Sequence, residues 1–151
     1  MKPQKITTFL TYNDQAEDAV RFYVSAFKNS RIRDTMRAGE RVISLQFELE
    51  GQEFIALNGG PSFTFAQGIS LFVACDTQQE IDELYEKLSA GGEKQPCGWL
   101  RDKFGVSWQV VPPVLGQLLG DKDREKADRV LQAMLKMQKI EIAALEKAAK
   151  G

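Results

Sequence analysis

The chain has 151 residues, of which 43% are hydrophobic and 27% charged, and this is the size and composition of one ordinary globular domain. Its 20 basic and 21 acidic residues give a formal net charge of −1, which excludes the concentrated positive charge with which nucleic-acid binders displace counterions. It contains no histidine, so nucleophilic catalysis by a Ser–His or Cys–His pair is excluded as well.

The first half of the chain predicts a strand, a helix and three more strands. Ile6–Tyr12 is rich in Thr and aromatic residues, as strands are. Asp14, with Glu17 three residues later, has the spacing of a capping box, and an apolar helical face follows it. Alternating apolar and polar residues make Val42–Glu50 the clearest strand. A weaker strand precedes it and a hairpin partner follows it, at residues 31–37 and 54–57.

The second half repeats this order. Ile69–Cys75 is an apolar strand, and Thr77 with Glu80 forms a second capping-box pattern. The helix that follows ends at Gly91-Gly92. Two strands are expected after it, at residues 96–101 and 106–111, with a turn at 102–105 between them.

Strand, helix and strands thus occur twice, which predicts an α+β fold. We expect two βαβββ modules, about residues 5–60 and 66–113, that form a curved, mostly antiparallel sheet. Together the modules make a paired domain over residues 1–113. A C-terminal helical extension over residues 114–151 completes the chain.

The extension is expected to hold a short apolar piece and then one long charged helix, from Asp123 to about Lys147. A helix with so much apolar surface must pack on something, either its own domain or a second subunit. Since the modules already carry covering helices, we expect a symmetric homodimer to which this helix contributes. Its large apolar residues are Val130, Leu131, Met134, Leu135, Met137, Ile140, Ile142 and Leu145.

Compartment is indicated by what the chain lacks. No apolar run approaches the ~20 residues needed to span a bilayer, and the N-terminal MKPQKITTF lacks the apolar stretch of a signal peptide. Cys75 and Cys97 form no CxxC motif, and a structural role as free thiols is expected for both, although basic residues near Cys97 leave reactivity open. The sequence therefore predicts a cytoplasmic protein with neither membrane nor nucleic acid as partner.

Several stretches carry a family likeness. They are AEDAVRFYVSAFKNSRI (16–32), FIALNGGPSF (54–63), ISLFVACDTQQEIDELYEKL (69–88), CGWLRDKFGVSWQVVP (97–112) and LQAMLKMQKIEIAALEKA (131–148). With these the chain resembles the vicinal-oxygen-chelate superfamily of glyoxalases, bleomycin-resistance proteins and extradiol dioxygenases. It is most similar to the PhnB-like branch, often labelled demethylubiquinone methyltransferase.

The resemblance also implies where a metal would sit. Metal sites of that superfamily use four inward side chains, usually His, Glu or Gln, and the matching positions fall at or near Thr8, Ala56, Ser70 and Gln109. Only the carboxamide of Gln109 is a plausible ligand among them, whereas transition metals need several imidazole, thiolate or carboxylate donors. This departure predicts no metal and no cofactor.

What the resemblance leaves is a pocket lined by inward residues of the modules. Strand parity places Gln109 on one face of its strand and Trp108 on the other, so that Trp108 belongs to the core if Gln109 points inward. The segment Phe63-Thr64-Phe65 between the modules is a candidate lid. The candidate ligand-pocket residues are Thr8, Ser70, Phe72, Trp99 and Gln109.

The leading interpretation is a metal-independent protein that binds an unknown small molecule. The alternative is an enzyme of the same superfamily, a lyase, isomerase or dioxygenase-like protein, with a divergent site built on carboxylates such as Glu48 or Glu53. A scaffold protein is a third possibility. The methyltransferase label finds no support in the sequence, because the chain has no GxGxG turn and its helices begin at Asp14 and Thr77 without glycine.

Overall fold

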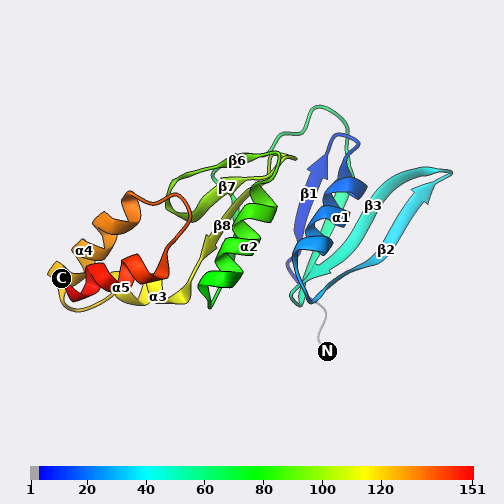
Figure 1. Ribbon diagram of the computed structural model, residues 1–151. Helices are drawn as coiled ribbons and strands as arrows, with labels where there is room; N and C mark the ends of the chain where they lie inside the picture. Colours follow the sequence, from blue (N-terminus) through cyan, green and yellow to red (C-terminus); the bar gives the residue numbers. More distant parts are fainter. Residues whose placement is uncertain (1–3) are drawn as a thin grey trace. The chain divides into compact units, whose positions relative to one another are not determined.

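Two units make up the computed structural model, which describes residues 4–151; the first ends at Phe65 and the second begins at Ala66. Each unit holds one four-stranded sheet and a helix that covers one face of it (Figure 1). The two βαβββ modules are therefore confirmed. Their strands form two separate sheets. Each sheet has one parallel pair, because the helix that follows the first strand makes a crossover connection.

In the first unit the strands lie in the order β1-β4-β3-β2. Leu10, Phe47 and Phe54 are buried on the face that packs against α1, whose buried residues include Val20 and Tyr23. The opposite face of the sheet carries the alternate side chains. The elements are β1 (Thr8–Tyr12), α1 (Ala16–Ala26), β2 (Ser30–Ala38), β3 (Arg41–Leu49) and β4 (Gln52–Asn58).

The start of α1 differs from the predicted capping box. Asp14 adopts a left-handed conformation (φ 60°), and Gln15 stands at the N-cap without a side-chain bond. The cap comes from β4, where Asn58 accepts the N–H of Ala16 through Oδ1 at 2.9 Å and donates to the carbonyl of Val42 at 3.0 Å. A residue 42 positions away thus serves the free N–H of the helix, which local spacing cannot reveal.

In the second unit the strands lie in the order β5-β8-β7-β6. The predicted cap of α2 is confirmed, since the Thr77 hydroxyl accepts the N–H of Glu80 at 3.2 Å. The strand expected at 96–101 is wrong in its first half, because Pro96–Gly98 form the short 3-10 helix η1, in which Cys97 has a φ of 64°. The elements are β5 (Ser70–Ala74), α2 (Gln78–Ser89), β6 (Glu93–Lys94), β7 (Trp99–Arg101) and β8 (Ser107–Val111).

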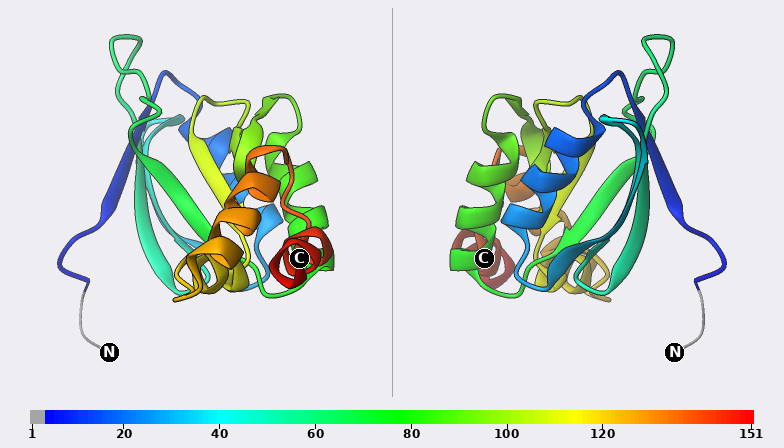
Figure 2. Two further views of the ribbon diagram at one scale, coloured as in Figure 1. Left: turned by 90° about the vertical axis from the view of Figure 1, so that its left-hand side faces the viewer. Right: turned by 90° about the vertical axis from the view of Figure 1, so that its right-hand side faces the viewer.

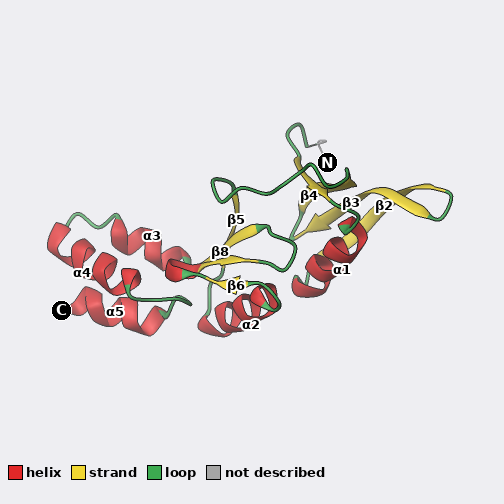
Figure 3. Ribbon diagram, turned by 90° about the horizontal axis from the view of Figure 1, so that it is seen from above, coloured by secondary structure: helices red, strands yellow, loops and turns green. Residues whose placement is uncertain are grey.

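The C-terminal extension consists of α3 (Pro113–Leu119), α4 (Arg124–Leu135) and α5 (Ile142–Lys150), so the expectation of one long helix is wrong. The helix is interrupted over residues 136–141, where the carbonyl groups of Met137 and Gln138 accept the N–H groups of Cys97 and Gly98. Helices α4 and α5 lie side by side (Figure 2), and the three helices gather next to β8 (Figure 3).

This extension has its own hydrophobic core. Val130, Ile140 and Leu145 are fully buried in it together with Leu115 of α3 and Val111 of β8. The extension therefore packs on its own unit, the first of the two possibilities that the sequence left open. No helix within residues 4–151 is long and apolar enough to cross a membrane.

Candidate functional site

One face of the second sheet is not the face that α2 covers. Trp108 and Leu100 point toward α2 and are almost completely buried, as strand parity predicted for Trp108. The alternate residues point to the other side. We call that side the open face; it carries Ser70, Phe72, Trp99, Arg101, Ser107 and Gln109.

Three candidate residues form a row across the open face. Phe72 of β5 is in register with Gln109 of β8, and Gln109 is in register with Trp99 of β7. The Gln109 Nε2 atom donates to the Ser70 hydroxyl at 3.0 Å, which fixes the plane of the amide between the two aromatic side chains. Phe72 is 61% exposed, and Trp99 is half-buried. The face thus offers two aromatic surfaces with a polar amide between them.

Backbone contacts hold Trp99 in this row. The hydroxyl of Tyr85, on α2, lies 2.8 Å from the carbonyl oxygen of Trp99 and 2.8 Å from that of Gln95. Burial raises the pKa of this tyrosine, so its hydroxyl stays protonated as a donor at neutral pH. The indole of Trp99 is therefore attached to a backbone that the covering helix restrains.

A buried carboxylate supports the turn between β7 and β8. Asp102 is only 2% exposed; its Oδ1 accepts the N–H groups of Phe104 and Val106 at 2.9 and 3.0 Å, and its Oδ2 accepts Trp108 Nε1–H at 2.8 Å. The turn that the sequence predicted is thereby tied to the core. Sequence reasoning missed this residue. The available signal was an aspartate two residues before Phe104-Gly105 and six residues before Trp108.

Thr8, the fifth candidate, belongs to the first unit and is not part of this row. It is in register with Phe54, on the face that packs against α1, and Ala56 is fully buried on that face too. Phe9 and Ile55 stand in register on the opposite face of the first sheet. The first-strand position suggested by the resemblance is therefore one residue from the side chain that points away from α1.

The carboxylates proposed for an alternative site are both ion-paired. Glu48 lies 3.1 Å from the guanidinium of Arg31, and Glu53 lies 2.9 Å from that of Arg33. Within residues 4–151 no group of three His, Cys, Asp or Glu side chains is arranged to hold a metal ion.

The burial and contacts of the two cysteines indicate a packing role for both. Cys75 is completely buried, and burial, reinforced by the nearby carboxylates of Glu80 and Asp76, raises its pKa to about 12. A thiol of this kind is not a nucleophile at neutral pH. Cys97 is half-buried and its Sγ lies 3.7 Å from the carbonyl oxygen of Met134.

In the candidate lid, the ring of Phe65 packs edge-on against Tyr12 with 5.1 Å between centroids.

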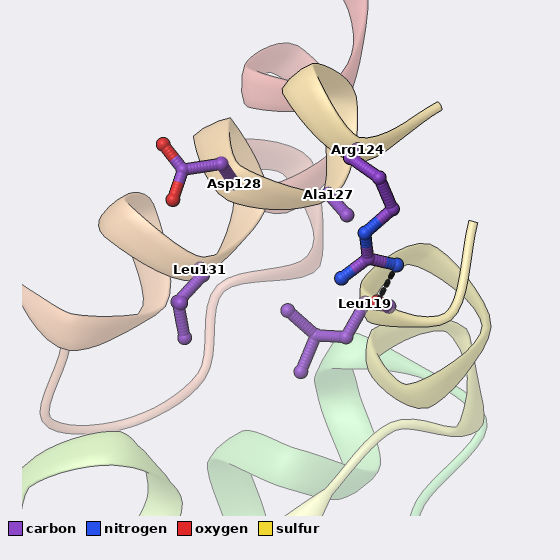
Figure 4. A pocket seen from close by; sticks show the side chains of 5 residues that line it. All are labelled: Leu119, Arg124, Ala127, Asp128 and Leu131. Carbon is purple, nitrogen blue, oxygen red and sulfur yellow. Dashed lines mark hydrogen bonds between the residues drawn. The ribbon is translucent and has the colours of Figure 1, made fainter. Parts of the chain in front are cut away.

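A separate hollow of about 430 Å³ lies in the extension (Figure 4). Arg124, at its rim, donates to the carbonyl oxygens of Asp121 and Leu119 at the end of α3, at 3.0 and 3.4 Å. The lining is mostly apolar and comes from α3 and α4: Leu119, Arg124, Ala127, Asp128 and Leu131.

Residues 4–111 match the model of a family described as 3-demethylubiquinone-9 3-methyltransferase. The chain belongs to this family. A PhnB protein from Bacillus cereus that carries the same family description is 39% identical; the match covers 72% of this chain and 99% of that chain, with a TM-score of 0.64. No protein of curated function matches.

More distant structures show the same fold. A protein from Pseudomonas aeruginosa is 18% identical over 73% of this chain and 98% of its own, with a TM-score of 0.61. The fosfomycin resistance protein FosX from Listeria monocytogenes, solved with Mn(II) and sulfate, is 16% identical over 73% of this chain and 92% of its own, with a TM-score of 0.53. At these identities the likeness shows the fold alone, so membership of the vicinal-oxygen-chelate superfamily stays a prediction from the sequence. The family model ends before residues 131–148, so their likeness to the branch stays a prediction.

Proposed function

We propose that this family member binds a small, flat, partly apolar molecule on the open face, without a metal ion. The observation that carries the proposal is the row of Phe72, Gln109 and Trp99, with the Gln109 amide held by Ser70 at 3.0 Å. Binding sites for small molecules combine apolar and aromatic surface with a few well-placed polar groups, and this row has both. An aromatic ligand would stack on the rings and accept or donate at the amide.

The chemistry of the donors supports metal independence. The open face offers hydroxyl, amide, guanidinium and aromatic groups, and the whole chain has no imidazole. Transition metals in proteins are held chiefly by imidazole, thiolate and carboxylate. We also propose that the chain does not transfer methyl groups from S-adenosylmethionine, since α1 and α2 follow Gln15 and Thr77 and not a glycine-rich turn that would hold the cofactor.

The test uses 1-anilinonaphthalene-8-sulfonate (ANS) as an aromatic probe, followed by its fluorescence in a titration. We expect one saturable site per chain, and affinity at least about tenfold lower in Phe72→Ala or Trp99→Ala, because stacking on an aromatic side chain contributes about 0.5–1.5 kcal/mol beyond its buried area. Met36→Ala is the matched control, since Met36 is 61% exposed like Phe72 but lies on β2 of the first unit. Equal affinities in all four proteins would place the probe elsewhere and refute the proposal.

Metal content needs a separate measurement. Elemental analysis of untagged protein, which has no histidine of its own, should find no stoichiometric zinc, nickel, manganese or iron after dialysis. One equivalent per chain that survives dialysis would contradict metal independence. Calorimetry with S-adenosylmethionine near 1 mM would detect even a binding free energy of about −4 kcal/mol, and a saturable isotherm there would contradict the second proposal.

We further propose a cytoplasmic homodimer. Cys75 and Cys97 are free thiols, which fits a reducing compartment.

The homodimer is supported by the apolar surface that the extension leaves uncovered, namely Leu135 and the hollow between α3 and α4. Light scattering over a dilution series should show a dimer that Leu135→Glu dissociates and the control Gln132→Glu, on the same helix, does not. A full-length chain that is monomeric at high concentration would refute it.

A further inference from the structure

The C-terminal extension lies outside the family core but is attached to it beside the open face. The family model ends at residue 111, and the match to the Bacillus cereus protein uses 99% of that chain but only 72% of this one. The extension is therefore an addition relative to that protein. Its contacts with the core show which part of the core it restrains.

The segment between α4 and α5, residues 136–141, holds the backbone that leads into β7. The N–H of Cys97 donates to the carbonyl of Met137 at 2.9 Å, and the N–H of Gly98 donates to that of Gln138 at 2.7 Å. Gly98 is buried, and a Cβ at this position would stand 3.0 Å from Ile140. These are the two residues directly before Trp99, the aromatic end of the proposed binding row.

Gln78, in the first turn of α2, connects this segment to the core. Its Nε2 donates to the carbonyl of Ile140 at 2.9 Å, and its Oε1 accepts the N–H of Ile142, the first residue of α5, at 2.7 Å. One turn further along α2, Asp82 accepts from Gln78 Nε2 at 2.9 Å and pairs with Lys139 at 2.8 Å. The amide of Gln78 thus holds the end of this segment together with the first residue of α5.

The extension also covers one end of the open face. Val111 has the same parity on β8 as Gln109, and it is buried in the core of the extension with Leu115, Val130 and Ile140. A ligand in the row of Phe72, Gln109 and Trp99 would therefore have the extension beyond Val111 at that end of β8.

We propose that Gln78 is a positioning residue for ligand binding: through residues 136–141 it fixes the backbone of Cys97 and Gly98 and thereby orients the Trp99 indole on the open face. Its effect on binding rests on the proposed function, whereas its effect on Trp99 does not. The extension then acts as a specificity element added to the family fold.

The test compares Gln78→Ala with Gln79→Ala, its neighbour on α2, whose side chain bonds to Glu83 of the same helix. Amide exchange at Cys97 and Gly98 should be at least about tenfold faster in Gln78→Ala, because the variant loses two hydrogen bonds to residues 140 and 142 and tenfold corresponds to about 1.4 kcal/mol. Gln79→Ala should exchange like the wild type. Gln78→Glu keeps the acceptor for the N–H of Ile142 but turns a carboxylate oxygen toward the Ile140 carbonyl and the Asp82 carboxylate, so it should exchange at least as fast as Gln78→Ala.

Iodide quenching of tryptophan fluorescence then reads the indole itself. Trp108 is buried, so the quenchable emission belongs to Trp99, which a Trp99→Phe variant verifies. Gln78→Ala should show a higher quenching constant, red-shifted emission and about tenfold weaker ANS binding. Unchanged exchange at Trp108 and Val110, which are buried in the second sheet, shows that the unit carrying the variant is folded.

The outcomes separate the two proposals. Quenching in Gln78→Ala equal to that in Gln79→Ala overturns the positioning role, whatever happens to amide exchange. Altered quenching with no ANS binding by the wild type leaves the positioning of Trp99 standing and refutes the proposed function. Altered quenching with ANS affinity equal to the wild type overturns the role of Gln78 in binding.

Discussion

Asp102 should be among the most costly residues to replace in the second unit. Replacing it by alanine leaves three donors without their acceptor, the N–H groups of Phe104 and Val106 and the indole N–H of Trp108. A buried donor left unsatisfied costs about 1–3 kcal/mol, and water reaching the two turn amides will recover part of that loss. We therefore expect the free energy of unfolding to fall by about 3–5 kcal/mol, the lower part of the range that three such donors would give.

Urea unfolding followed by tryptophan fluorescence measures this loss, because both tryptophans, Trp99 and Trp108, lie in the second unit. Asp102→Asn is the isosteric control: its oxygen can still serve the turn amides, but its NH2 group faces the indole N–H, so a loss of about 1–3 kcal/mol is expected. Trp108→Phe completes a double-mutant cycle for that single bond. A loss below about 1 kcal/mol in Asp102→Ala would refute the assigned role.

Three further changes test other parts of the second unit. Ile140→Ala, which empties a fully buried site in the core of the extension, should cost about 2–5 kcal/mol in urea unfolding; a loss like that of exposed Leu135→Ala would contradict this packing. Gly98→Ala should lower the melting temperature, because φ is 82° and the new Cβ would lie 2.9 Å from the Val110 carbonyl oxygen, whereas Gly68→Ala, with open space around it, should not. Cys75, whose pKa is raised from 9.0 to about 12, should resist iodoacetamide at pH 8 until the protein unfolds. Between pH 9 and about 12 the unfolded thiol ionises while the folded one keeps its proton, which favours unfolding. The free energy of unfolding should therefore be unaffected by the ionisation of Cys75 below pH 9 and should fall as the pH rises from 9 to about 12. A Cys75→Ala protein with the same alkaline stability profile would argue against this.

Much of the fold could be predicted from local pattern. The alternation in β3 and the Thr77 cap of α2 depend on neighbouring residues, and both appear as expected. The same parity argument placed Trp108 in the core and Gln109 on the other face of β8. Four of the five candidate residues consequently stand on one face of one sheet.

What local pattern missed was decided by distant residues. The N–H of Ala16 is capped by Asn58 of β4. The predicted long helix is interrupted at 136–141, where the carbonyl groups of Met137 and Gln138 accept the N–H groups of Cys97 and Gly98. Thr8 faces α1 and its neighbour Phe9 faces the other way, since successive residues of a strand point to opposite faces. The cap of α1 and the end of α4 could therefore not be predicted from one segment at a time.

The outer strand of the first sheet has a consequence for solubility. β2 is nine residues long and stands at the edge of its sheet, where unpaired N–H and C=O groups invite a strand from another molecule. Its pairing with β3 is interrupted twice, between Ile32 and Asp34 and between Met36 and Arg37. It also carries three arginines and an aspartate, Arg31, Arg33, Arg37 and Asp34. Irregular register and clustered charge make this edge a poor template for intermolecular β-pairing, so the chain is protected against aggregation at its longest exposed edge strand.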